Sequence, residues 1–145
     1  MFKHILIPTD GSELAEKGLD QGLLLAKTLG AAATVIVVTV PLSGFALQGM
    51  TEAAALGAYD NSVAEELAAL KRNIADKAAK AGIAFDFVNV IDASPASAIL
   101  EVATEKECDL IVISSHGRRG IRRLMLGSQT AEVLGGSTIP VLVVK

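Results

Sequence analysis

The chain has few aromatic residues, one cysteine and no long hydrophobic run, and each shortage excludes a class of protein. Aromatic residues make up 3% of the 145 residues and tryptophan is absent, so the rings on which single-stranded nucleic acids stack are scarce. The lone Cys108 excludes an internal disulfide framework and a multi-cysteine metal site. No apolar run reaches the roughly 18 residues of a membrane span, and no signal-peptide pattern is present. We therefore expect a cytoplasmic protein without membrane insertion.

The net charge is small and negative. Thirteen Lys and Arg stand against sixteen Asp and Glu, a formal charge of −3, so attraction to nucleic acid or anionic lipid through bulk charge is not expected. Apolar residues make up 51% of the chain, which excludes a disordered protein. The length is typical of one domain, and we expect that domain to span residues 1–145.

Short runs rich in Val and Ile alternate with helical stretches. The predicted strands are residues 3–8, 34–40, 85–91, 110–114 and 139–144, and the predicted helices are residues 13–29, 63–81, 95–105 and 128–134. Several strands are apolar at successive positions, as in a parallel sheet buried on both faces. The alternation predicts an α/β fold, a single open five-stranded parallel sheet with helices on both faces.

Capping residues mark several helix ends. Ser12 and the pair Ser94-Pro95 are typical helix starts, and Gly30 and Gly82 are typical helix ends. Residues 41–61 fit neither strand nor helix, because they contain three glycines, little charge and no clear period. We interpret them as a mobile loop with a helical turn around residues 52–56.

The carboxyl ends of the strands are where an open parallel sheet binds its ligand. Pro8, Thr9 and Asp10 close the first strand. The Asp10 carboxylate has three possible uses: accepting a ribose hydroxyl, reaching a metal through water, or capping the following helix.

The segment after the fourth strand concentrates glycine and arginine. Gly117, Gly120 and the pair Gly127-Ser128 lie there with four of the five arginines, at positions 118, 119, 122 and 123. Free amides at a helix start and guanidinium groups both favour phosphate, although such a segment is also compatible with a solvated turn. His116 is either a phosphate contact, an acid or base, or a hydrogen-bonding loop residue. The phosphate-binding motif G-x-x-x-x-G-K-[ST] is absent, so the usual phosphoryl-transfer machinery is incomplete.

Four runs in this order resemble the universal stress protein family. They are ILIPTDGS from Ile5, HGRRG from His116, LMLGS from Leu124 and IPVLVV from Ile139. The nucleotide-binding branch of that family carries G-x2-G-x9-G-[ST] after the fourth strand. Gly117, Gly127 and Ser128 match the second glycine, the third glycine and the hydroxyl residue, whereas Ser114 stands at the first glycine.

The resemblance implies an adenine nucleotide alpha hydrolase-like sheet of order 3-2-1-4-5 that binds ATP, with Mg²⁺ or Mn²⁺ as a possible companion. The nucleotide-binding residues it implies are Pro8, Thr9, Asp10, Val40, Ile113, Ser114, His116, Gly117, Arg118, Gly127, Ser128 and Gln129. It also implies a homodimer through residues 139–144. Pro140 suits such an edge strand because it cannot donate a ladder hydrogen bond.

Three functions follow from these observations. The first is a stress-response protein that binds an adenine nucleotide as a sensor or regulator and is not an efficient enzyme; the choice among ATP, AMP and cyclic AMP stays open. The second is a dimeric interaction module that binds no nucleotide and addresses a regulatory protein not identified by any motif. Ser114 and the apolar segment 41–61 favour this alternative. The third is a slow ATPase, for which Asp10 and His116 are the candidate bases near the phosphates.

Overall fold

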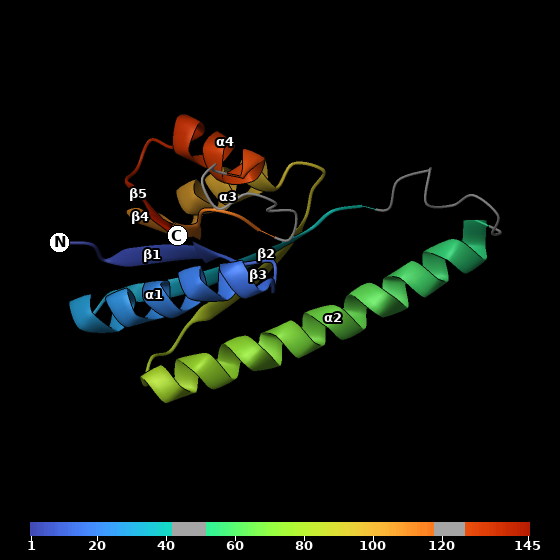
Figure 1. The fold of residues 1–145 in the computed structure, drawn as a ribbon, viewed down its shortest axis with the longest axis horizontal. Helices are drawn as coiled ribbons and strands as arrows, with labels where there is room; N and C mark the ends of the chain where they lie inside the picture. Colours follow the sequence, from blue (N-terminus) through green and yellow to red (C-terminus); the bar gives the residue numbers. More distant parts are fainter. Residues whose placement is uncertain (42–51, 118–126) are drawn as a thin grey trace.

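A five-stranded parallel sheet forms the centre of the computed structural model, which describes residues 1–41, 52–117 and 127–145 (Figure 1). Its strands are β1 (His4–Pro8), β2 (Ala32–Thr39), β3 (Asp86–Ile91), β4 (Leu110–Ser114) and β5 (Val141–Val144). They lie in the order β3-β2-β1-β4-β5, and each neighbouring pair is parallel. The predicted α/β class is confirmed, and so is the strand order that the resemblance implied.

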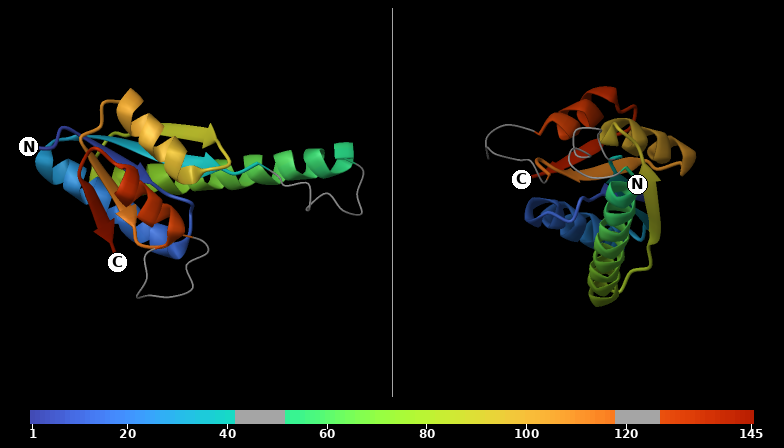
Figure 2. Two further views of the ribbon diagram at one scale, coloured as in Figure 1. Left: turned by 90° about the horizontal axis from the view of Figure 1, so that it is seen from above. Right: turned by 90° about the vertical axis from the view of Figure 1, so that its right-hand side faces the viewer.

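Helices cover both faces of this sheet. They are α1 (Glu13–Leu29), α2 (Glu52–Ala81), α3 (Pro95–Glu105) and α4 (Ser128–Gly136). Helices α1 and α2 lie on one face, and α3 and α4 lie on the other (Figures 1 and 2). In β1, Ile5 and Ile7 belong to the core under α1 and α2, whereas Leu6 belongs to the core under α3 and α4. All three are fully buried, which explains the nearly continuous apolar runs of the central strands.

Capping residues define the helix ends that the sequence predicts. The Ser12 hydroxyl accepts a hydrogen bond from a first-turn amide of α1, and Gly30 ends that helix with a φ of 64°. Ser94 accepts in the same way ahead of Pro95 at the start of α3. Both helices therefore cover the predicted ranges.

Helix α1 approaches the sheet very closely at two glycines. A methyl group at Gly22 would lie 2.7 Å from Ile7 Cδ1, and one at Gly18 would lie 3.0 Å from the backbone nitrogen of Ser114. Both distances are shorter than a normal non-bonded contact. The helix therefore packs directly on the carboxyl ends of β1 and β4, where the sequence places the candidate site.

The opposite, amino edge of the sheet is held by Asp109, which precedes β4. Its carboxylate accepts hydrogen bonds from the backbone amides of Lys3 (2.8 Å) and His4 (3.0 Å). The bond from His4 is the main cause that lowers the pKa of Asp109 below its ordinary value. Beside it, His4 Nε2 lies 2.8 Å from Thr34 Oγ1. These contacts lie at the amino edge of the sheet, opposite the carboxyl edge where the candidate site is expected.

Helix α2 corrects the sequence-based interpretation of residues 41–61. It begins at Glu52 and not at residue 63. The helical turn expected around residues 52–56 is therefore part of a helix, the loop expected for residues 57–61 is wrong, and residues 42–51 lie outside the described residues. The start of α2 projects past the sheet (Figures 1 and 2), and Gly57, Asp60 and Asn61 are exposed. Residues 41–61 show no clear apolar period in the sequence, and that period is the signal by which an amphipathic helix is detected. Among the helices of the described segments, none has the combined length and apolar character needed to cross a membrane.

The strand β5 begins two residues later than predicted, at Val141 and not at Ile139. Pro140 precedes it, and the Pro140 carbonyl accepts a hydrogen bond of 3.0 Å from the amide of Ile111. Because proline lacks an N–H, the ladder donors of β5 start at Val141. The strand lies at one edge of the sheet, and its Leu142 side chain is 44% exposed.

Candidate functional site

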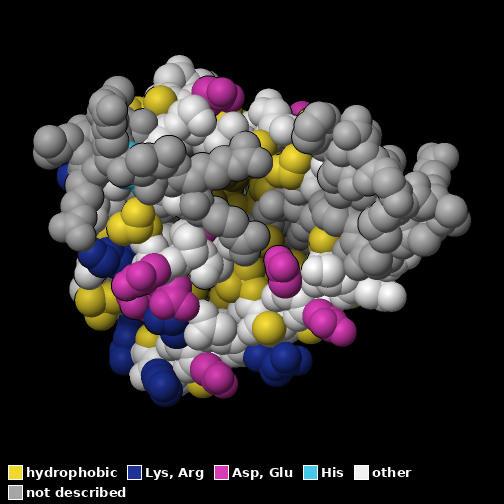
Figure 3. Space-filling view, turned by 45° about the vertical axis from the view of Figure 1, so that its right-hand side comes forward, with side chains coloured by type: hydrophobic (Ala, Val, Ile, Leu, Met, Phe, Trp, Pro, Cys, Tyr) yellow, Lys and Arg dark blue, Asp and Glu magenta, His cyan; other side chains and the backbone are white. Residues whose placement is uncertain are grey.

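A cavity of about 1240 Å³ opens at the carboxyl edge of the sheet. The ends of β1, β2 and β4 form its floor, and α2 and the start of α4 form two of its walls. Figure 3 faces this edge obliquely and shows hydrophobic side chains in the hollow near the centre of the view. The volume is larger than that of most small-molecule sites, which span about 300–1,000 Å³.

The end of β1 contributes Thr9 and Asp10 to this cavity. Thr9 is buried, its amide donates to the carbonyl of Ile36 (3.0 Å), and its hydroxyl accepts from the amide of Gly11 (3.3 Å). One oxygen of Asp10 accepts from the amide of Ser12 (2.9 Å), in a turn that precedes the helix, whose N-cap residue is Ser12 itself. This turn holds the Asp10 carboxylate at the mouth of the cavity.

The second oxygen of Asp10 faces the segment after β4. A methyl group placed on Gly117 would lie 2.5 Å from Asp10 Oδ2. The absence of a side chain at Gly117 therefore allows the Asp10 carboxylate to approach the backbone that follows β4. The two predicted segments, far apart in the sequence, meet at this point.

Residues 114–117 form a turn held by buried hydrogen bonds. The Ser114 hydroxyl donates to the carbonyl of His116 (2.9 Å), and the amide of Gly127 donates to the carbonyl of Ser115 (2.7 Å). His116 is 6% exposed, and its Nδ1 lies 3.1 Å from Ser115 Oγ. Because the polar groups are paired inside the protein, the turn is held in one conformation.

Helix α4 begins at the cavity with a glycine cap. Gly127 is its N-cap residue and makes no side-chain cap hydrogen bond, and Gly127, Ser128 and Gln129 all line the cavity. The first amides of an α-helix have no partner within the helix, and they carry the positive end of its dipole. This end of the cavity has the chemistry that favours an anion such as phosphate.

The Gln129 side chain has a structural task at the same end. Its Oε1 accepts a hydrogen bond of 2.9 Å from the amide of Ala96, in the first turn of α3. Ser94 caps another amide of that turn. The Gln129 side chain therefore joins the starts of α3 and α4.

Every residue of the predicted site that the structure describes lines this one cavity. These residues are Pro8, Thr9, Asp10, Val40, Ile113, Ser114, His116, Gly117, Gly127, Ser128 and Gln129. Arg118 lies outside the described residues, as do the other arginines of the predicted cluster. The strand ends and the start of α4 are thus brought together as the parallel topology requires.

The wall formed by α2 is absent from the sequence prediction. Its lining residues are Ser62, Val63, Glu66, Leu67, Ala69, Leu70 and Asn73. The spacing of Val63, Leu67, Leu70 and Ile74 repeats every three or four residues, which is the signal of a helix face. That period can be detected in the sequence, but no sequence feature indicates that residues 62–73 of this helix border the site.

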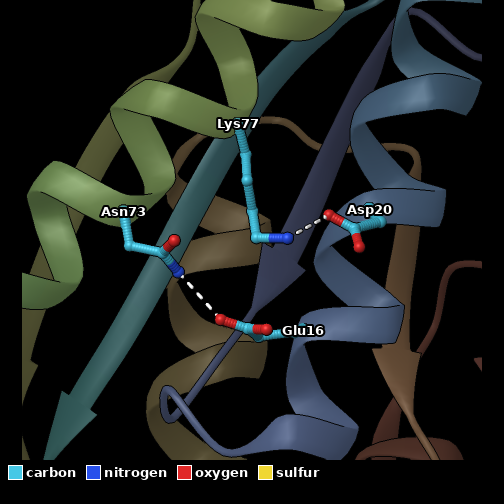
Figure 4. Close-up of polar contacts among 4 residues, drawn as sticks. All are labelled: Glu16, Asp20, Asn73 and Lys77. Carbon is cyan, nitrogen blue, oxygen red and sulfur yellow. Dashed lines mark hydrogen bonds and ion pairs between the residues drawn. The ribbon is translucent and has the colours of Figure 1, made fainter.

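Helix α2 is attached to α1 by two polar contacts (Figure 4). Asn73 donates to Glu16 (2.9 Å), and Lys77 lies 2.7 Å from Asp20. The bond to Asp20 is the main cause that raises the pKa of Lys77. One turn closer to the cavity, Leu70 packs 3.4 Å from the position of a methyl group on Gly11. These contacts hold α2 as a wall of the cavity.

Two other candidate chemistries have little support in the described segments. No group of three or more His, Cys, Asp and Glu side chains there could hold a metal ion. Cys108 is 6% exposed, and its burial raises the pKa of the thiol to about 11. A thiol with such a pKa is protonated at neutral pH and is a poor nucleophile.

The whole sequence, residues 1–145, matches the model of the Universal stress protein family. The chain belongs to this family. Universal stress protein YxiE of Bacillus subtilis (strain 168) is 32% identical, and the match covers 100% of both chains. The resemblance found in the sequence is therefore confirmed.

Solved structures of universal stress proteins and their relatives share the fold. The structure of hypothetical protein MJ0577 of Methanocaldococcus jannaschii has a TM-score of 0.81 at 30% identity, covering 100% of this chain and 96% of that one. A universal stress protein solved in complex with cAMP has a TM-score of 0.74 at 26% identity, covering 99% and 97%. A family member of similar sequence and fold thus binds an adenine nucleotide.

Proposed function

We propose that this protein binds an adenine nucleotide, ATP with Mg²⁺ or Mn²⁺, and acts as a stress-response sensor or regulator and not as an efficient enzyme. The observation that carries the proposal is the start of α4, whose glycine cap and first turn line the cavity. Unpaired first-turn amides suit a phosphate. The complex of a related universal stress protein with cAMP supports the same class of ligand.

The nucleotide would span the cavity from β2 to α4. The base and ribose would lie over Val40, Thr9 and Asp10, where a carboxylate and a hydroxyl are available. The phosphates would reach Gly127 and Ser128. The sequence has no P-loop lysine, and this favours binding over rapid phosphoryl transfer.

Isothermal titration of nucleotide-free protein tests this proposal. ATP with Mg²⁺ is expected to bind saturably below millimolar concentration, and AMP, cyclic AMP and GTP in parallel titrations define the preference. The absence of heat with every nucleotide up to millimolar concentration would contradict the proposal. Phosphate release above the buffer blank that His116→Ala abolishes would instead indicate a slow ATPase.

A second candidate function is a dimeric interaction module that binds no nucleotide. It is favoured by Ser114 at the first glycine position of the motif and by α2, which projects past the sheet (Figure 2). Native mass spectrometry of the protein as purified separates the two functions. A co-purifying nucleotide mass supports the first, and an unliganded protein that also gives no titration heat supports the second.

We further propose that the protein forms a homodimer through residues 139–144. The edge strand β5 pairs with β4 on one side, and its Leu142 is 44% exposed; an apolar edge of this kind favours pairing with a second strand. Light scattering after size exclusion is expected to give a dimer, and Leu142→Lys a monomer. The matched control is Ile91→Lys at the opposite edge strand, where the side chain is 71% exposed. A monomeric wild-type protein would contradict this arrangement.

A further inference from the structure

We propose that Ser114 is a positioning residue, whose buried hydroxyl holds the turn 114–117 in the geometry that the anion site at α4 requires. This inference rests on the proposed nucleotide function and deepens it. Ser114 stands where the nucleotide-binding motif has glycine. The serine is thus an integral part of the site and not an obstruction in it.

Ser114 is bonded in two directions. Its hydroxyl donates 2.9 Å to the carbonyl of His116, two residues further along the turn. Its own carbonyl accepts a hydrogen bond of 2.8 Å from the hydroxyl of Thr130, in the first turn of α4. Ser114 and Thr130 are 5% and 4% exposed, so neither bond competes strongly with water. One residue therefore joins the end of β4, the turn and the helix whose amides line the cavity.

Room for the serine side chain comes from α1. Gly18 has no side chain, and a methyl group there would lie 3.4 Å from Ser114 Cβ and 3.0 Å from its backbone nitrogen. In β4, Leu110 and Val112 point into the core under α1, and the period of two places Ser114 on the same face. The close approach of α1 thus encloses the hydroxyl and directs it to the turn.

The turn set by Ser114 controls the position of Gly127. The carbonyl of Ser115, between the two bonded residues, accepts the 2.7 Å hydrogen bond from the amide of Gly127. The amide of Ser115 donates 2.8 Å to Val144 of β5. A shift of the turn would therefore move the N-cap of α4, and a displaced site binds more weakly because the protein must reorganise before it binds.

The decisive variants are Ser114→Ala and Ser114→Gly, compared with Thr34→Val. Thr34 is also buried, and its hydroxyl lies 2.8 Å from His4 Nε2 at the amino edge of the sheet. The control thus removes a buried hydroxyl far from the cavity. We expect both Ser114 variants to raise the Kd for ATP about tenfold, the equivalent of one lost hydrogen bond. Adenosine, which has no phosphate, should change by less than about twofold, and Thr34→Val should change neither affinity.

The Ser114→Gly variant separates this inference from the expectation of the motif. If glycine is optimal at this position, the variant binds ATP at least as tightly as the wild type, and the inference is wrong. Equal weakening of ATP and adenosine would also overturn it, because a general loss of structure produces that pattern. A loss confined to ATP supports it.

Amide hydrogen exchange without nucleotide provides a second measurement that does not depend on the proposed function. In Ser114→Ala, the amides of Ser115 and Gly127 are expected to exchange faster than in wild type, whereas Thr34→Val leaves them unchanged. Unchanged exchange in Ser114→Ala refutes the positioning role. If the wild type binds no nucleotide, the proposed function fails, and the exchange rates still decide whether Ser114 holds the turn.

Discussion

The substitution Gly127→Asp tests the anion site most directly, because it places a carboxylate at the N-cap of α4. An N-cap carboxylate accepts hydrogen bonds from first-turn amides, the same groups that the phosphates would use. The new negative charge also repels the phosphates. We expect ATP binding to be lost while the circular dichroism spectrum stays that of the wild type.

The structure limits how far this variant changes stability. Replacing an N-cap glycine by Asp stabilises a helix by a few tenths of a kcal/mol. Against this, a methyl group at Gly127 would lie 3.3 Å from the carbonyl oxygen of Ser115 and 3.5 Å from His116 Cα, a crowding that small shifts can relieve. We expect these two effects to change the free energy of unfolding by less than about 1 kcal/mol in total.

The expected change in affinity is much larger. Two unit charges about 4 Å apart interact by roughly 4 kcal/mol at an effective dielectric constant of about 20. Repulsion of that size weakens binding about 1,000-fold. The Kd for ATP should therefore rise by at least about 30-fold, even if solvent screens half of the repulsion.

Titration of ATP into Gly127→Asp and Gly127→Asn separates charge from volume. Asparagine has nearly the same size and is also a good N-cap, so its variant should lose about tenfold or less in affinity. Equal losses in the two variants would show that crowding, and not charge, explains the effect. Wild-type affinity in Gly127→Asp would mean that the phosphates do not bind at α4, and the reasoning from the helix start would be wrong.

Three further predictions concern other parts of the molecule. Gly117→Ala should weaken ATP binding because its methyl group displaces the Asp10 carboxylate. In the Asp10→Ala background the same substitution should reduce ATP affinity much less. Losses of affinity that add up in the double variant, measured by titration, would contradict the contact. Asp109→Asn should lower the free energy of unfolding at neutral pH. The folded protein lowers the pKa of the Asp109 carboxyl, so the ionised carboxylate stabilises the fold above the unfolded-state pKa of about 3.9. This stabilisation is lost as the pH falls through the folded-state pKa. In urea unfolding, the difference in the free energy of unfolding between wild type and Asp109→Asn should disappear in acid; a difference that stays constant with pH would refute this. The thiol of Cys108, with a pKa of about 11, should react with a thiol reagent only on unfolding; immediate labelling of the native protein would contradict its burial.

Local signals in the sequence predicted the helix ends best where a cap was present. The serine caps at Ser12 and Ser94 and the glycine at Gly30 are short-range features, and the structure bears them out. Residues 52–61 carried no comparable signal. Their Ala-rich composition favours a helix, but their apolar residues show no clear period in the sequence, and this is why periodicity placed the start of α2 at residue 63.

The candidate site was predictable in its location and not in its internal contacts. A parallel sheet brings the residues after β1, β2 and β4 to one edge, and the described members of the predicted set do line one cavity there. Two of its hydrogen bonds depend on the direction in which a side chain points: the bond from the Ser114 hydroxyl to the His116 carbonyl and the bond from the Ala96 amide to the Gln129 side chain. No spacing in the sequence indicates such directions.

The α/β class, the alternating elements and the family could be predicted from the amino-acid sequence, because apolar periodicity, caps and motifs are properties of neighbouring residues along the chain. Three features became visible only in the folded protein: α2 forms a wall of the cavity, Gly18 makes room for Ser114, and Asp10 lies against Gly117. Each of these joins segments far apart in the chain. Their contacts arise from how helices pack on the two faces of the sheet, which depends on side-chain volume in three dimensions and not on order in the sequence.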